Sequence, residues 1–462
     1  MLHDFLLRII STYLRNLISK HNYEHDFYYN NNEIVKLMSL NQRFYSIRYI
    51  FIKQLCLNDH QSEYAYTNKP YNWNKVHFMR FFMSDISDVS ALGTCHYLAL
   101  VSCKNISDVS SLRKCHSLAL ISCQNIRDLS TLGTCHSLVL KFCDIIRDVS
   151  ALSTCHSLVL HHCENISDVS ALGNCHSVKL RSCQNIRDVS ALGNCHSVKL
   201  RSCQNIRDVS ALGKCHSLVL ESCDNISDVS ALGKCHSLKL RYCQNISNVS
   251  ALGTCHSLVL DSCANIRDVS ALGKCHSLTL RYCPNVRDVS ALGTCRSLVL
   301  WDCKKINNVS SLGTCHSLVL YFCQNISDIS ALGKCHSLEL RHCHNIRDVS
   351  ALGTCHSLLL EHCQKISDVS ALGTCHSLEL SNLNISDVSA LGTCHSLLLE
   401  HCQKISDVSA LGTCHSLELS NLNISDVSAL GTCHSLKLDS CENIRDISAL
   451  KDVKNLTISV RI

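Results

Sequence analysis

The sequence predicts an α/β repeat solenoid, in which one long parallel β-sheet is assembled from many copies of a short unit. The first observation is a fixed period, since the Asp of a recurring Asp-Val-Ser segment stands at positions 88, 108, 128, 148, 168, 188, 208 and 228. The second is the Leu-x-Leu alternation of each copy, as at Leu98 and Leu100, which has the two-residue period of a strand. The third is the unit's length, because about 20 residues leave room for a strand and a 3₁₀ turn but little for an α-helix. Such a period is the signature of a solenoid.

The repeats vary in length and some are identical. Asn248 and Asn308 replace the Asp, and the spacing shortens near the end, as between Asp368 and Asp387. Residues 171–190 recur unchanged as 191–210, and residues 358–396 recur as 397–435. We expect repeats of 19–20 residues over 88–452, an N-terminal cap of the solenoid over 76–87 and a C-terminal cap over 453–462.

One copy illustrates the predicted unit. The side chains expected to point inward are Cys95, Leu98, Leu100, Cys103, Ile106, Val109 and Leu112. The Asp of Asp-Val-Ser is expected to accept backbone N–H groups in an Asx-turn, which leads into a short 3₁₀ or extended segment on the convex side. Gly93 and its equivalents are expected to adopt a positive φ, although Arg113 and Ser153 occupy the same column.

This unit resembles the leucine-rich repeat, L-x-x-L-x-L-x-x-N/C-x-L, with Cys in the first Leu position and Cys in the Asn/Cys position. Its Ile-Ser-Asp-Val-Ser-x-Leu half is similar to the short repeats of internalins and of phosphatase-regulator leucine-rich proteins. Its Cys-x-x-Ile element is similar to the cysteine-containing class of F-box proteins. The resemblance covers residues 86–460 and implies a horseshoe or rod with one parallel sheet whose concave face holds a protein.

Composition limits the classes of function. The chain has 43 Lys+Arg against 38 Asp+Glu and only 5% aromatic residues, which disfavours a nucleic-acid partner. Its 35 cysteines fall almost entirely in two repeat columns, where they suit a buried core. Asp4 and Arg8 interrupt any secretory signal, and no apolar run is long enough to span a bilayer. We therefore expect an intracellular protein of the cytoplasm or nucleus, with reduced thiols and no membrane partner.

A partner-binding surface is predicted at the outward positions equivalent to 99, 101 and 102, where the copies differ most. The middle copies are basic and the late copies are acidic, with large residues between them. The predicted concave-face residues are Lys179, Arg181, Lys199, Arg201, Lys239, Arg241, Tyr242, Arg281, Tyr282, Trp301, Tyr321, Phe322, Glu339, Arg341, Glu361 and Glu379, with Glu221, Asp261, Glu400 and Glu418 in the same columns. Exposed aromatics beside charges are typical of protein-binding hot spots. The alternative is a scaffold in which these columns vary without a ligand.

A histidine column, His96, His116, His136 and onward, is broken only by Arg296. Stacked imidazoles can chelate a transition metal, but Cys-x-x-Cys spacing is absent and adjacent His and Cys point to opposite faces. We favour a packed ladder of neutral imidazoles. Because Cys and His recur in nearly every copy, no nucleophile–base pair stands out. We predict no catalytic residue, no cofactor and no metal.

Residues 1–57 carry a different pattern, with apolar residues at helical spacing from Leu2 to Ile18 and again from Glu33 to Tyr45. Three short helices fit, followed by a polar linker over 58–75. Residues 2–14 resemble the F-box opening L-P-x-E-L-L-x-x-I-x-x-Y-L, and residues 37–45 resemble its L-x-x-v-c-k-x-f-y segment. The resemblance implies docking to a Skp-type adaptor and cullin, with an unknown protein as the ubiquitination substrate. The adaptor-binding residues would be Leu2, Leu6, Ile9, Leu14, Leu40 and Phe44.

Two other interpretations of this segment remain open: a helical cap on the first strand of the solenoid, and a helix at a membrane surface. With a cap, the protein would be a non-catalytic scaffold or regulatory repeat protein.

Overall fold

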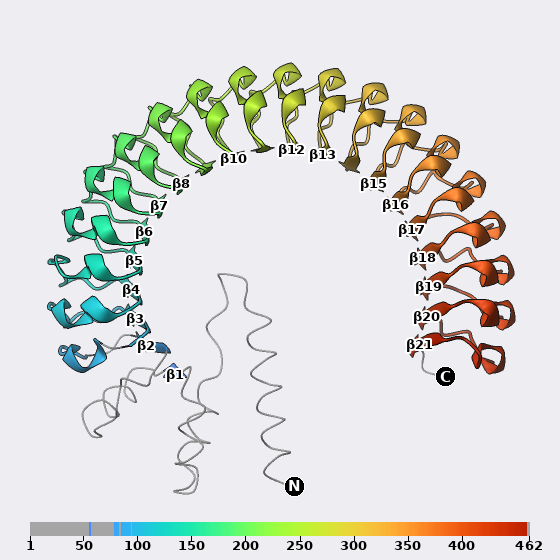
Figure 1. The fold of residues 1–462 in the computed structure, drawn as a ribbon, viewed down its shortest axis with the longest axis horizontal. Helices are drawn as coiled ribbons and strands as arrows, with labels where there is room; N and C mark the ends of the chain where they lie inside the picture. Colours follow the sequence, from blue (N-terminus) through green and yellow to red (C-terminus); the bar gives the residue numbers. More distant parts are fainter. Residues whose placement is uncertain (1–54, 57–77, 83–84, 94, 460–462) are drawn as a thin grey trace, which may run out of the picture.

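The computed structural model describes residues 55–56, 78–82, 85–93 and 95–459, which wind into an open arc (Figure 1). Parallel strands line the inner side of the arc, and short 3₁₀ helices lie on the outer side. The predicted solenoid with one parallel sheet and a 3₁₀ convex side is confirmed, and its form is the horseshoe rather than the rod. The predicted helices of residues 1–54 lie outside the described residues.

The sheet contains 21 strands. Their bounds are β1 Leu55–Cys56, β2 Phe78–Phe82, β3 Tyr97–Val101, β4 Ser117–Ile121, β5 Ser137–Lys141, β6 Ser157–His161, β7 Ser177–Arg181, β8 Ser197–Arg201, β9 Ser217–Glu221, β10 Ser237–Arg241, β11 Ser257–Asp261, β12 Ser277–Arg281, β13 Ser297–Trp301, β14 Ser317–Tyr321, β15 Ser337–Arg341, β16 Ser357–Glu361, β17 Ser377–Ser381, β18 Ser396–Glu400, β19 Ser416–Ser420, β20 Ser435–Asp439 and β21 Asn455–Ser459.

A 3₁₀ helix precedes each strand from β3 to β21. These helices are η3 Ser90–Leu92, η4 Ser110–Lys114, η5 Leu132–Thr134, η6 Ser150–Thr154, η7 Ser170–Asn174, η8 Ser190–Asn194, η9 Ser210–Lys214, η10 Ser230–Lys234, η11 Ser250–Thr254, η12 Ser270–Lys274, η13 Ser290–Thr294, η14 Ser310–Thr314, η15 Ser330–Lys334, η16 Ser350–Thr354, η17 Ser370–Thr374, η18 Ser389–Thr393, η19 Ser409–Thr413, η20 Ser428–Thr432 and η21 Ser448–Leu450.

Consecutive strands pair in parallel with the same register, so each residue type stacks on its equivalent. Leu258 pairs with Leu278 and Leu260 with Leu280, for example. From β3 to β20 the two alternating apolar side chains of each strand are 0–2% exposed, and they are leucines except for Val178 and Val198. Both cysteine columns are buried as well, and together these side chains form one continuous core along the arc. All seven inward positions predicted from the copy that begins at Cys95 are 0–2% exposed. The alternation therefore assigned the two faces of the sheet correctly.

The cysteines from Cys95 to Cys441 are free and buried. Most of these thiols donate to a backbone carbonyl of the preceding repeat: Cys263 Sγ donates to the oxygen of Leu240 at 3.7 Å, and Cys275 Sγ donates to the oxygen of Leu252 at 3.6 Å. Burial raises the pKa of Cys95 to about 11 and that of Cys275 to about 12. The columns are structural, since a thiol with a raised pKa is a poor nucleophile.

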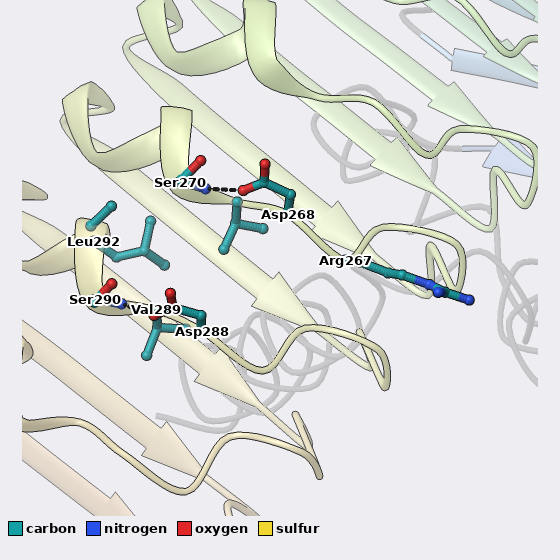
Figure 2. Close-up of a pocket in the computed structure, with 9 residues that line it drawn as sticks. Arg267, Asp268, Ser270, Asp288, Val289, Ser290 and Leu292 are labelled. Carbon is teal, nitrogen blue, oxygen red and sulfur yellow. Dashed lines mark hydrogen bonds between the residues drawn. The ribbon is translucent and has the colours of Figure 1, made fainter.

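The convex turn follows the predicted Asx geometry. The N–H of Ser90 donates to Asp88 Oδ1 at 2.8 Å, and the two substitutes, Asn248 and Asn308, accept the equivalent bond at 3.0 and 2.9 Å. Figure 2 shows one such turn, in which Asp268 accepts the N–H of Ser270. An Asn side chain supplies the same acceptor oxygen as Asp, which explains why the column admits both.

The expected positive φ of Gly93 and its equivalents is wrong. Gly93 has φ −60°, and none of the described glycines has a positive φ. Glycine is favoured here because neighbouring repeats approach closely: a Cβ on Gly253 would lie 2.0 Å from the carbonyl oxygen of Ala271. The positive φ falls instead on the residue after each strand from β3 to β20, such as Ser102 and Tyr242. Its N–H donates to the next repeat, as from Ser102 to the oxygen of Ile121 at 2.8 Å, and so extends the sheet by one bond.

Both ends of the sheet extend beyond the 20-residue pattern. β2 lies in the range expected to form the N-terminal cap, and β1, at the end of the range predicted to be helical, pairs with it in parallel. The outer edge of a sheet leaves backbone N–H and C=O groups unpaired. β1 pairs with β2 along this edge and so satisfies some of those groups. At the other end β21 pairs with β20, and its residues are mostly exposed.

Candidate functional site

The candidate site is the concave sheet face, where each strand presents a middle and a final side chain, followed by the side chain of the positive-φ residue. Most of these positions are half-buried or exposed, with exceptions such as Glu221 and Asp261, whereas the alternating apolar side chains from β3 to β20 are fully buried. Because strands are about 4.8 Å apart, equivalent side chains form continuous columns. The face can therefore present side chains over many repeats to one extended partner.

The predicted basic residues lie on strands β7 to β12 and form what we call the basic segment. Lys179 pairs with Lys199 and Arg181 with Arg201 across adjacent strands. The remaining members are Lys239, Arg241 and Arg281, on β10 and β12.

Two acids divide the basic segment, and both are buried. Glu221 is 5% exposed and lies 3.4 Å from Arg201, 3.5 Å from Lys199 and 3.9 Å from Arg241. Asp261 is 3% exposed and accepts a bond from Arg241 Nε at 3.1 Å. Both acids were visible in these columns from the sequence, but their burial and their ion pairs with the neighbouring cations are known only from the structure.

His161, at the end of β6, is a further residue beside the basic segment that the sequence analysis missed. Burial and the charges of Arg181, His162, Lys141 and Arg201 lower the pKa of His161 to about 4. Its Nε2 is buried without a hydrogen-bond partner. A neutral imidazole on β6 therefore lies beside the first strand of the basic segment. Its equivalence to Arg181 in the next repeat was the sequence signal that could have identified it.

The aromatic cluster consists of Tyr282, Trp301, Tyr321 and Phe322. The ring centroids of Trp301 and Tyr321 lie 4.2 Å apart, and those of Tyr321 and Phe322 lie 4.7 Å apart. The guanidinium of Arg281 lies 4.1 Å from the Trp301 ring, a cation–π contact. Trp301 Nε1 and Arg281 Nε are buried without a hydrogen-bond partner. The four rings of the cluster therefore lie next to Arg281, the last cation of the basic segment in strand order.

Tyr242 does not belong to this cluster. Its repeat is separated from that of Tyr282 by the repeat that carries Ser262, and its ring lies beside Arg241, at 5.7 Å from the guanidinium. Tyr242 lies at the predicted outward position, but its contacts could not be predicted from the sequence. His342, by contrast, was not predicted and stacks on Phe322 with ring centroids 4.4 Å apart.

The acidic segment lies on β15 to β19 and contains Glu339, Glu361, Glu379, Glu400 and Glu418. Arg341 bonds to Glu361 through Nη1 and to Glu339 through Nε and Nη2, both at 3.2 Å. Burial raises the pKa of Glu379, opposed by Arg341 and reinforced by the neighbouring glutamates. Lys437 bonds to Glu418 at 2.6 Å. The segment keeps an excess of negative charge.

The histidine column forms a stacked ladder, as predicted. Neighbouring rings from His96 to His276, and again from His316 to His434, have centroids 4.4–4.6 Å apart and are inclined by 4–13°. The rings are mostly exposed rather than buried. Desolvation, followed by the two neighbouring imidazoles, lowers the pKa of His116 and His256.

Shallow depressions lie between neighbouring convex turns. One is lined by Asp268, Ser270, Asp288 and Ser290 (Figure 2), and another lies between the turns at Asp228 and Asn248. The N–H of Ser290, and then its hydroxyl, lowers the pKa of Asp288. Because the same turn recurs in each repeat, these depressions are a product of the repeat and single out no reactive group.

The structure shows a leucine-rich repeat solenoid.

No family model matches the sequence, and no curated protein matches it. In the described part of the chain, no helix combines the length and hydrophobicity needed to cross a membrane. The predicted adaptor residues Leu2, Leu6, Ile9, Leu14, Leu40 and Phe44 lie outside the described residues.

Solved structures similar to this chain include an internalin (inlF) of Listeria monocytogenes, with 18% identity over 82% of this chain and 84% of that chain and a TM-score of 0.21. The functional domain of InlJ from the same organism, described as including a cysteine ladder, has 16% identity over 77% and 71% and a TM-score of 0.32. The TLR13–ssRNA13 complex has 16% identity over 85% and 71% and a TM-score of 0.45.

Proposed function

We propose that the protein is a non-catalytic binding protein that holds a protein partner on the concave face of its solenoid. The observation that carries the proposal is the order of chemistry along that face: the basic segment, the aromatic cluster and the acidic segment follow one another in the strand order β7 to β19. Arg281 and Trp301 supply the residue types that dominate binding energy at protein interfaces.

This order favours a partner of complementary charge. A ligand with acidic residues opposite the basic segment, an apolar or aromatic residue opposite the cluster and basic residues opposite the acidic segment would match all three. β10 belongs to the basic segment and β16 to the acidic segment, and six strand spacings of about 4.8 Å separate them by about 29 Å. An extended peptide of about nine residues has this length. The charged contacts would speed association and select the orientation, while the cluster would provide most of the affinity.

The experiment is a selection of random peptides on the immobilised full chain. Enrichment of peptides with the predicted charge order, and loss of their binding in the Trp301→Ala, Tyr321→Ala variant, would support the proposal. Phe142→Ala is the matched control, because Phe142 is exposed on the same face but distant in the strand order from the cluster. Peptides that bind the double variant as tightly as the parent would refute it.

The finer proposal, that residues 2–57 act as an F-box and deliver the partner to a cullin ubiquitin ligase, rests on the sequence resemblance alone. It is tested by capture of a Skp-type adaptor and cullin on the full chain and on the Leu6→Asp, Phe44→Asp variant. Loss of capture in this variant, but not in Trp301→Ala, Tyr321→Ala, would support it. Absence of capture by the folded parent would favour the cap interpretation and leave the proposed concave-face binding intact.

A further inference from the structure

Two imidazoles and a carboxylate converge at the edge of the concave face between β15 and β16. One ligand atom from each of His342, Glu361 and His362 can be chosen so that all lie within 4.8 Å of one another. The two histidines occupy successive positive-φ positions, with φ 52° and 51°, and their rings stack with centroids 4.4 Å apart. Glu361 is the last residue of β16 and immediately precedes His362. The local backbone thus brings the three side chains together from only two repeats.

The carboxylate is held by Arg341. Glu361 Oε2 accepts a bond from Arg341 Nη1, while Oε1 lies 3.9 Å from His362 Nε2. One oxygen is therefore fixed by the guanidinium and the other faces the imidazoles. Glu339 binds the remaining face of Arg341, so the cation is shared between two acids and the local charge stays negative.

We propose that His342, Glu361 and His362 bind a divalent transition-metal ion such as Zn²⁺. Imidazole nitrogen and carboxylate oxygen are ordinary zinc ligands, and three protein ligands leave a fourth position open. Zinc–nitrogen bonds of about 2.0–2.1 Å require the ligand atoms to move closer together, and rotation of the half-exposed side chains supplies that movement. Arg341 would be a positioning residue that presents one oxygen of Glu361.

This proposal departs from the sequence-based expectation of no metal site. That expectation was made for the whole chain and was argued from the histidine ladder, in which most rings have other imidazoles as neighbours. Within the described residues, His342, Glu361 and His362 are the group of three such side chains that meets the distance condition. His344, whose ring lies 6.1 Å from that of His342, borders the same site.

The chain contains an internal control. Residues 358–396 and 397–435 are identical, so Glu400 and His401 repeat the Glu361–His362 pair in the same sequence context. The repeat that precedes the second pair carries Ser381 and Asn382 in place of Arg341 and His342. Ser381 Oγ donates to Glu400 Oε2 at 3.3 Å. The second pair therefore lacks both the first imidazole and the positioning guanidinium, and we expect it not to bind the ion tightly.

The test is a Zn²⁺ titration of the full chain against a chromogenic competing chelator, supported by the visible absorption of bound Co²⁺. We expect one tight ion per chain and a loss of affinity greater than about 100-fold in His342→Asn, because removal of a direct ligand exceeds the 10–100-fold effect of outer partners. Glu361→Gln should weaken binding in the same direction. Asn382 and Asn421 already occupy the same backbone position, so the Asn variant should keep the fold.

His401→Asn is the matched control, since it removes an imidazole from the identical second copy and should leave the tight ion in place. The histidine ladder is present in every variant, so its weak binding contributes equally to all titrations. An equal loss in His401→Asn and His342→Asn, or a parent that binds Zn²⁺ no more tightly than His342→Asn, would overturn the proposal.

Discussion

Replacing Glu221 with Gln is expected to destabilise the middle of the solenoid. The substitution preserves the volume of the side chain and removes a buried charge that faces Lys199, Arg201 and Arg241 at 3.4–3.9 Å. At about 3.5 Å and an effective dielectric constant of about 20, each contact corresponds to about 5 kcal/mol before hydration is counted. The cations are 33–39% exposed, so water offsets most of that energy in both states. We expect a net loss of about 1–3 kcal/mol in the free energy of unfolding.

The assay is urea unfolding followed by far-ultraviolet circular dichroism, with the slope of the free energy against urea unchanged. Glu339→Gln is the control, because that side chain is 37% exposed and bonds to Arg341 alone; it should cost less than about 1 kcal/mol. A loss in Glu221→Gln no larger than that of the control would refute the reasoning. The same variant unpairs Lys199 and Arg201, so it should also bind acidic peptides more tightly, with an effect that added salt reduces.

Three further predictions follow from the core and the ladder. The melting temperature should fall from pH 7.5 to 5.5, because the pKa values of His116 and His256 are lower in the folded chain than in the unfolded chain. As the pH falls, the unfolded chain therefore takes up protons first. The stability that is present above about pH 6.5 is lost as the pH falls through the lowered pKa values. Constant melting over that range would contradict this. At pH 8 a thiol reagent should react with Cys95 in the folded chain at least about 100-fold more slowly than with Cys95 in the chain unfolded in urea. The reason is that a pKa of about 11 in the folded chain reduces the thiolate fraction of Cys95 by about that factor. Rapid labelling of Cys95 in the folded chain would contradict this prediction. Leu260→Ala should cost about 2–5 kcal/mol, whereas Leu456→Ala, at a 37% exposed position of β21, should cost less than about 1 kcal/mol, and equal urea midpoints would show the core assignment to be mistaken.

The repeat made the core predictable because each column appears many times with the same burial. Leu98, Leu100 and Cys103 could be assigned to the interior from alternation alone. The glycine column failed because a sequence shows that a small residue is favoured without showing whether φ or space requires it. Here the reason is the carbonyl of the next repeat, which lies close to the position of the missing Cβ.

For the candidate site, the sequence could predict which positions face outward but not which side chains contact one another. The outward positions followed from the strand period, so the basic, aromatic and acidic segments could be named. Their pairings depend on side-chain directions between repeats: Glu221 forms ion pairs with cations on both neighbouring strands, and Tyr242 falls outside the aromatic cluster. The group of His342, Glu361 and His362 was missed because His342 precedes Glu361 by almost a full repeat.

The identity of residues 358–396 and 397–435 makes the length of this arc adjustable. Removal of 397–435 would join Ser396 to Leu436, which reproduces the natural Ser435–Leu436 junction. Strand β17 would then pair with β20, which pairs with β19 in the full chain. β17 and β19 have the same sequence. Every interface of the shortened chain would already exist in the longer one. Unequal recombination at this point can therefore add or remove two turns of the coil without a new side-chain contact, so the reach of the concave face can change by whole units while the core chemistry stays fixed.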